Sequence, residues 1–135
     1  MAHPVMWFEV LGNDGGKLRR FYGDLFGWRF GANDPPEYGI VSTGDSRGIP
    51  GGIGQSYPGT RPWVTFYVET SDVTTSLKQA ETLGGKIVMP RTAMPGVTLG
   101  VFEDPEGGAA ENLKAVYAEI RDMLAEIVVA TRGTA

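Results

Sequence analysis

The chain has 135 residues, with 12 Lys and Arg against 16 Asp and Glu and a net charge of -4. This length suits a single domain whose core needs no covalent staple, and the acidic balance without a basic run disfavours a nucleic-acid partner. The absence of cysteine excludes a disulfide framework, a thiol nucleophile and a Cys-ligated metal. No apolar run reaches the length of a membrane span, and Met1–Val10 lacks the pattern of a signal peptide, so we expect no membrane partner and a cytoplasmic location.

The first regular pattern is in Val5–Asp14, where large apolar residues alternate with other residues before a polar stop, and it returns in Trp63–Asp72. The aligned pairs are Met6 with Val64, Phe8 with Phe66, Val10 with Val68, Asp14 with Asp72, Leu25 with Leu83, Gly27 with Gly85, and Phe30 with Val88. The period of two predicts a half-buried strand in each segment. The ungapped agreement predicts that the chain contains an internal repeat.

A helix is predicted after each of these strands. Possible N-caps stand there, namely Asn13 or Asp14 and Ser71 or Asp72. Apolar residues then recur at spacings of three and four, and they are Leu18, Phe21, Tyr22 and Leu25 in one segment and Val73, Leu77, Ala80 and Leu83 in the other. Gly27 and Gly84–Gly85 are expected to end the helices, because glycine adopts a positive φ at low cost.

Short extended segments broken by Gly and Pro follow each helix. They are residues 28–32, 38–44 and 48–55 in the first half, and residues 86–90 and 98–105 in the second. The repeated unit is therefore β-α-β-β-β. We predict an α+β fold in a single domain over 1–135, with modules at about 4–56 and 63–112 joined by a linker over 57–62.

The C-terminal segment has a different pattern, because apolar residues recur there at helical spacing among many Ala, Glu, Leu, Lys and Arg. These apolar residues are Leu113, Val116, Tyr117, Ile120, Leu124, Ile127 and Val128. The pattern predicts an amphipathic helix over about 113–130. Its apolar stripe would pack on the sheet or against a second copy of the chain.

Several ordered motifs over residues 4–111 carry a family resemblance, and they are WFEV, LRRFYGDLFGWRF, PGGIG, WVTFYVETSDV, AETLGGKIVMP and GVFEDPEG. On these motifs the chain resembles the vicinal oxygen chelate superfamily, which includes glyoxalase I, bleomycin-resistance proteins and extradiol dioxygenases. The resemblance implies two modules whose strands form a curled mixed sheet, a cup around a small organic ligand, within a homodimer. The fold does not fix the function, because the same scaffold serves metal enzymes and metal-free binders.

The resemblance also implies where a metal would bind, near the start of each module's first strand and on its last strand. Val5 and Trp63 occupy the first-strand positions, and neither can bind a metal. The last strand of the first module offers Gly52–Gly54, with Gln55 adjacent, and only Glu111 matches the family's glutamate. Because one carboxylate does not make a metal site, we expect no metal and no cofactor.

Two residues leave alternatives open. His3 is the sole histidine and lies two residues before Val5, about 6 to 7 Å from the implied ligand position, so an exposed residue near the N-terminus is its simpler interpretation. Glu111 belongs either to a last strand or to the C-terminal helix.

The period of two divides the first strands into two faces. If Met6, Phe8, Val10 and their counterparts face the helices, the cup side carries Val5, Trp7, Glu9, Trp63, Thr65 and Tyr67. The predicted ligand-binding residues are Trp7, Glu9, Gln55, Trp63, Thr65, Tyr67 and Glu111. The aromatic residues either stack on a planar or cationic ligand, or form core beneath a partner or the C-terminal segment.

Glu9 is costly on an enclosed aromatic face unless its carboxylate is compensated. Three explanations are open for it: solvent in an open cleft, a bond to an Arg such as Arg91, or a role as a proton carrier. No catalytic residue is assigned.

The leading hypothesis is a metal-free small-molecule-binding protein of the glyoxalase or bleomycin-resistance type. The alternatives are a metal-dependent glyoxalase-like or dioxygenase-like lyase, isomerase or oxidoreductase, and a dimerisation module that uses the C-terminal helix. GGIGQ lacks the following helix that a phosphate loop needs, and a single histidine gives a Ser-His arrangement no support.

Overall fold

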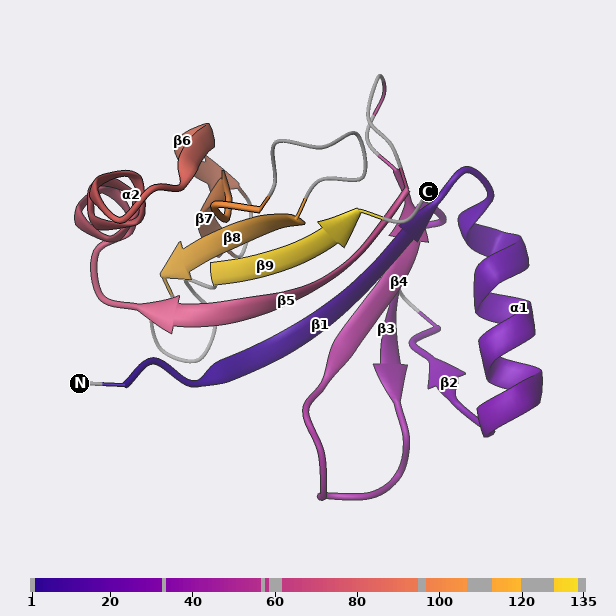
Figure 1. Cartoon of the computed structure of the whole chain (residues 1–135). Coiled ribbons are helices and arrows are strands. Elements are labelled where there is room, and N and C mark those ends of the chain that lie inside the picture. The colour runs from indigo at the N-terminus through magenta and orange to yellow at the C-terminus, as the bar shows by residue number, and fades with distance from the viewer. Residues whose placement is uncertain are drawn as a thin grey trace.

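The structure is a computed structural model that describes residues 2–32, 34–56, 58, 62–94 and 97–106, and the backbone of 113–119 and 128–133. Its elements follow the order β-α-β-β-β twice and then one further strand (Figure 1), which confirms the α+β class. They are β1 Val5–Gly12, α1 Gly15–Phe26, β2 Arg29–Phe30, β3 Tyr38–Ser42, β4 Gly51–Gln55, β5 Trp63–Thr70, α2 Val73–Thr82, β6 Lys86–Met94, β7 Val97–Glu103, β8 Leu113–Glu119 and β9 Val128–Gly133.

The described strands form one mixed sheet in the order β2-β3-β4-β1-β5-β9-β8-β7-β6. In the first half β1 pairs in parallel with β4, and in the second half β5 pairs in parallel with β8. The two halves meet where β1 and β5 run antiparallel. Figure 1 shows α1 beside the first half and α2 beside the second, with β1 and β5 between them.

Equivalent aspartates begin the two helices, as the repeated pattern predicts. Asp14 Oδ1 accepts a hydrogen bond of 3.0 Å from the Lys17 backbone N–H, and Asp72 Oδ1 accepts one of 3.0 Å from that of Thr75. These bonds satisfy N–H groups that have no partner inside the helix. Gly27 ends α1 with a φ of 73°, a conformation that favours glycine.

The helices cover one face of the sheet, and the opposite face is called the inner face below. On the helix side Ile53 of β4 is fully buried, as is Val73 of α2. On the inner face a buried cluster joins strands of both halves, and it consists of Leu11, Trp63, Tyr67, Leu99 and Val101. The main core therefore lies where the two halves meet.

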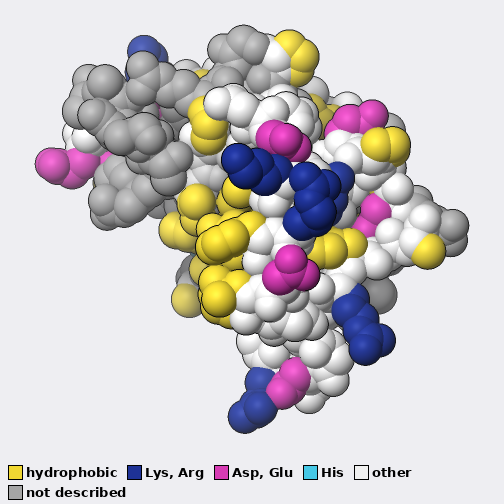
Figure 2. Space-filling model, turned by 90° about the vertical axis from the view of Figure 1, so that its right-hand side faces the viewer, with side chains coloured by type: hydrophobic (Ala, Val, Ile, Leu, Met, Phe, Trp, Pro, Cys, Tyr) yellow, Lys and Arg dark blue, Asp and Glu magenta, His cyan; other side chains and the backbone are white. Residues whose placement is uncertain are grey.

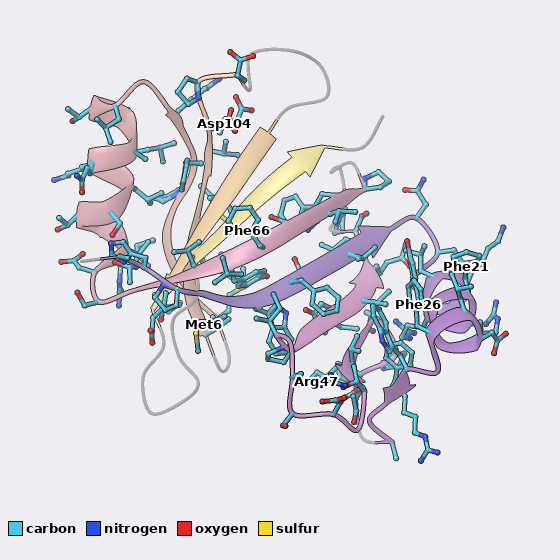
Figure 3. All side chains as sticks on the ribbon, turned by 60° about the horizontal axis from the view of Figure 1, so that its bottom comes forward. Met6, Phe21, Phe26, Arg47, Phe66 and Asp104 are labelled. Carbon is cyan, nitrogen blue, oxygen red and sulfur yellow. The ribbon has the colours of Figure 1, made fainter. Side chains whose placement is uncertain are left out.

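On the helix side of the sheet, neither helix covers the middle strands. Because α1 packs on β4 and β1, and α2 packs on β6, β7 and β8, the side chains of Val64 and Phe66 on β5 stay 45% and 42% exposed. Met6 on β1 is exposed as well. These three residues lie on the helix side of the sheet, as the period of two predicts, but neither helix covers them. Figure 3 labels Met6 and Phe66 on these adjacent strands, and the three residues are called the central apolar face below.

A second group of exposed apolar residues lies on α1, and it includes Phe21, Leu25 and Phe26. Figure 2, which views the molecule from the side that carries α1, shows hydrophobic side chains gathered beside Lys and Arg side chains. Rings of this helix also contact Trp28, whose centroid lies 5.0 Å from that of Phe26 and 5.6 Å from that of Phe8. Through this aromatic cluster α1 packs against β1.

The predicted C-terminal helix over about 113–130 is wrong where these residues are described, because Leu113–Glu119 and Val128–Gly133 form strands β8 and β9. The physical reason is that β5 and β7 offer unpaired backbone groups to β8, and these pairings outweigh a local helix preference. Residues 120–127, most of the linker 57–62, and Glu111 lie outside the described residues. In the part of the chain that is described, no helix is both long and apolar enough to cross a bilayer.

Candidate functional site

The pairing of β1 with β5 brings the predicted inner-face residues together. Trp7 lies opposite Tyr67, Glu9 opposite Thr65, and Leu11 opposite Trp63. Residues that are directly paired point to the same side of a sheet, so both strands place these side chains on the inner face. Their role in ligand binding stays a prediction.

Glu9 is the centre of this group, with its side chain only 2% exposed. Its Oε1 accepts a hydrogen bond of 3.0 Å from Trp63 Nε1. Its Oε2 accepts bonds from two tyrosine hydroxyls, at 2.8 Å from Tyr67 and 2.9 Å from Tyr38. The Tyr38 hydroxyl also accepts a bond of 2.9 Å from Trp7 Nε1, so four aromatic residues belong to one network around the carboxyl group.

Burial and hydrogen bonding act on Glu9 in opposite directions. Burial raises the pKa of Glu9 above its usual value and is the larger effect, because removing a carboxylate from water disfavours the charged form. The bonds from Tyr67, Tyr38 and Trp63 favour the charged form and lower the pKa in part. Arg91, considered above as a partner, is exposed on β6, and its charge acts on Asp72.

Glycines on β4 allow Tyr38 to reach Glu9. Gly52 pairs with Glu9 and Gly54 pairs with Leu11, so both glycines lie on the inner face. A Cβ at Gly52 would collide with the Tyr38 hydroxyl and ring, and a Cβ at Gly54 would lie 2.7 Å from Tyr38 Cδ1. The Tyr38 ring therefore rests directly on the backbone of β4, which any other residue at Gly52 would prevent.

One end of the site is open to solvent. Ile40 pairs with Gly52 and so lies on the inner face, where its side chain is 47% exposed. Tyr38 and Trp7 beside it are partly exposed. An accessible apolar and aromatic surface, called the shelf below and defined by Trp7, Tyr38 and Ile40, thus lies next to the buried carboxyl group.

The other end of the site is closed. Trp63 is 9% exposed and packs with Tyr67, Leu99 and Val101 in the buried cluster. Of the two interpretations of the inner-face aromatic residues, burial favours core for Trp63 and Tyr67. The accessible aromatic surface is on the side of Trp7.

Several residues considered in the sequence lie away from the Glu9 network. Gln55 faces α1 instead of the inner face, since its Oε1 accepts a bond of 3.0 Å from the Gly15 N–H and its Nε2 donates one of 2.5 Å to the Asn13 carbonyl. Val5 is exposed, and His3 is exposed with its Nδ1 2.9 Å from the Glu69 carbonyl oxygen. Among the described residues no three His, Cys, Asp or Glu side chains form a group that could hold a metal.

Tyr38 and Ile40 are the site residues that sequence reasoning missed. A signal for them exists, because the alternation in Tyr38–Ser42 places both on one face, and the alternate glycines Gly52 and Gly54 indicate that something approaches the backbone closely. The partner of those glycines depends on the pairing of β3 with β4, which the sequence does not state.

Comparison with known proteins gives distant relatives. No protein-family model matches the chain. Two curated proteins are 29% identical over 120 residues, namely the anthracycline biosynthesis proteins DauV of Streptomyces sp. (strain C5) and DnrV of Streptomyces peucetius. The alignment covers 76% of this chain and 44% of each relative, so the chain spans less than half the length of the curated relatives that it matches.

A solved structure shares the fold. The NAD-dependent benzaldehyde dehydrogenase structure from Legionella pneumophila superposes with a TM-score of 0.61, covering 91% of this chain and 99% of that chain. The sequence identity is 15%, so the likeness concerns the fold and not the activity.

Proposed function

We propose that this chain is a small-molecule-binding protein of the glyoxalase or bleomycin-resistance type, which holds a planar aromatic ligand on the inner face without a metal. The observation that carries the proposal is the shelf of Trp7, Tyr38 and Ile40 next to the buried, hydrogen-bonded Glu9. Apolar and aromatic walls with a few polar groups are typical of small-molecule sites.

The relatives support the class of ligand. They are anthracycline biosynthesis proteins. The aromatic part of an anthracycline is a planar fused-ring system. A planar ring system gains both apolar burial and stacking when it lies on a tyrosine or tryptophan ring. Because the chain matches only part of each relative, the ligand is proposed by its chemistry and not by its name.

Tryptophan fluorescence tests the proposal. The chain has three tryptophans, and Trp28 lies in the aromatic cluster of α1, so a Trp28→Phe background leaves Trp7 and Trp63 as reporters. We expect anthraquinone sulfonate to quench their emission saturably, with the stoichiometry checked by calorimetry. Cyclohexane sulfonate, which has no aromatic ring, is the control probe. Absence of saturable binding of the aromatic probe would contradict the proposal.

An enzyme is the second candidate, and the environment of Glu9 favours it, since a buried carboxyl group with a raised pKa is typical of a catalytic acid or base. A metal-dependent lyase, isomerase or oxidoreductase would bind a divalent ion during purification or assay. Elemental analysis of the purified protein and activity assays with added Mn²⁺, Fe²⁺ or Zn²⁺ separate this candidate from simple binding.

A homodimer, which the family resemblance implies, is also proposed. The central apolar face supports it, because Met6, Val64 and Phe66 are exposed on adjacent strands. The relatives are more than twice as long as the matched segment, which leaves room in them for a second unit of similar size. A second copy of this chain is the occupant that we propose for this face.

A further inference from the structure

The ring of Tyr38 has an unusual setting for a side chain on a sheet. It lies across two glycines of β4, with Cδ1 over Gly54 and the hydroxyl end over Gly52. A side chain that stands upright on a sheet does not contact the neighbouring strand in this way. One side of the ring is therefore covered by backbone, and the side chain lies on the inner side of the sheet, where it packs beside the buried cluster and stays partly exposed.

Two hydrogen bonds fix this orientation. The Tyr38 hydroxyl donates to Glu9 Oε2 at 2.9 Å and accepts from Trp7 Nε1 at 2.9 Å. The glycines and the two hydrogen bonds together hold the ring in place from both ends. A ring that is already fixed loses little conformational freedom when a ligand stacks on it, which favours binding.

The bond to Glu9 also affects the electron density of the ring. A phenol that donates a hydrogen bond to a carboxyl oxygen gains electron density, and the gain is greatest when the carboxyl group is ionised, at a pH above the raised pKa of Glu9. The face of an electron-rich ring attracts electron-poor or cationic partners. Trp7 and Ile40, which also lie on the inner face and are at least partly exposed, extend the accessible surface near it.

We propose that Tyr38 is the stacking platform for the ligand, that Glu9 is a positioning residue which fixes and polarises Tyr38, and that the site prefers planar electron-poor rings of the quinone type. The inference rests on the proposed function, because it names the contact residue and the ligand class of the same site. Glu9 acts through Tyr38 and does not itself touch the ligand.

The test uses two probes of the same shape and charge, anthraquinone sulfonate and anthracene sulfonate, with dissociation constants measured by calorimetry on the full chain. We expect the wild type to bind the quinone more tightly. Tyr38→Leu removes the platform and should weaken quinone binding by about tenfold. Tyr22→Leu, which removes an aromatic ring from the cluster of α1, is the matched control and should leave binding unchanged.

Tyr38→Phe and Glu9→Gln test the polarisation. Each keeps an aromatic platform, but the phenylalanine cannot donate to Glu9 and the glutamine carries no charge at any pH. At a pH above the raised pKa of Glu9, each variant should therefore lose most of the preference for the quinone over the hydrocarbon. A purely structural role of Glu9 would weaken both probes equally and would overturn the assignment.

The outcomes are distinguishable. If the wild type binds neither probe, the proposed function fails, and the inference fails with it. If the wild type binds and Tyr38→Leu retains its affinity, the platform is elsewhere, while the proposed function stands. If Tyr38→Leu does not fold, the probe preference of Tyr38→Phe decides: its loss supports the inference, and an unchanged preference contradicts it.

Discussion

Glu9 combines two tendencies that oppose each other. Its three donors, Tyr38, Tyr67 and Trp63, suit an ionised carboxylate, which only accepts hydrogen bonds. Its burial favours the protonated form, and burial is the larger effect on its pKa. The group is therefore sensitive to any change that alters the hydration of the inner face.

The raised pKa of Glu9 gives a pH dependence of known sign. The folded state holds the proton more tightly than the unfolded state, so the contribution of Glu9 to stability is fully present below the unfolded pKa of about 4.5 and is lost as pH rises through the higher folded value. We expect the free energy of unfolding of the wild type, minus that of Glu9→Gln, to decrease with pH across this window.

Urea denaturation of both proteins at a series of pH values measures this difference. Subtracting the free energy of unfolding of the variant removes the contributions of other carboxyl groups. One of these is Asp72, whose pKa is lowered by its hydrogen bonds to Thr75. A difference that stays constant or increases with pH would contradict the assignment of Glu9 as a group whose ionisation is penalised by burial.

A substitution of Trp63 tests whether this inner-face residue belongs to the core or to a binding surface. Because it is 9% exposed and packs in the buried cluster, Trp63→Ala should leave a cavity and cost about 3 to 5 kcal/mol of unfolding free energy. Phe21→Ala is the matched control, since Phe21 is an aromatic residue of α1 whose side chain is 57% exposed; it should cost about 1 kcal/mol or less. Chemical denaturation measures both, and similar losses for the two variants would refute the core interpretation of Trp63.

At the scale of elements, close approach of helices to strands depends on glycine. Gly100 on β7 lies beneath α2, where an added Cβ would be 2.7 Å from Leu77 Cδ1 and 2.8 Å from Val73 Cγ1. Both neighbours are buried, so they have little space to move. The close distance between α2 and β7 therefore depends on the absence of a side chain at Gly100.

Gly100→Ala should lower the free energy of unfolding by about 1 to 3 kcal/mol through overpacking. Gly16→Ala is the control and should change the free energy of unfolding in the opposite direction. Gly16 lies in the first turn of α1, and the nearest atom to an added Cβ is 3.6 Å away. Because alanine favours a helix more than glycine does, we expect this variant to raise the free energy of unfolding by about 0.5 kcal/mol. Thermal or urea denaturation compares the two. If Gly100→Ala were neutral, α2 would pack less closely than the structure shows.

At the scale of the whole molecule, the two halves of the sheet bury one face where they meet and leave the other uncovered between the helices. The central apolar face is the result, because each helix packs on its own half and β5 lies between them. Exposed apolar residues on adjacent strands are typical of a surface that another molecule covers.

We expect the chain to sediment as a dimer and Phe66→Lys to shift it to the monomer, because a charge in the middle of an apolar contact is costly to bury. Val88→Lys, an exposed apolar position on β6, should leave the dimer intact. Sedimentation velocity at several concentrations measures both variants. A monomeric wild type, or a dimer that is insensitive to Phe66→Lys, would contradict the proposed occupant of this face.

The local structure follows from short-range patterns in the sequence. Period-two alternation, the capping aspartates and the helix-ending glycines predict β1, α1, β5 and α2, because each depends on residues a few positions apart. The same alternation predicts that Glu9 and Trp63 share a face, since side chains alternate whatever the strand pairs with. These features need no knowledge of the rest of the chain.

Features that depend on pairing between distant segments could be learned only from the folded chain. The strand β8 lies where helix preference predicts a helix, because its backbone pairs with β5 and β7. Tyr38 reaches Glu9 only because β3, β4 and β1 are neighbours and β4 has a glycine between them. Hydrogen bonds between strands and contacts across a sheet join residues far apart in the chain, and their energies can override local preference. They therefore cannot be predicted from any single segment.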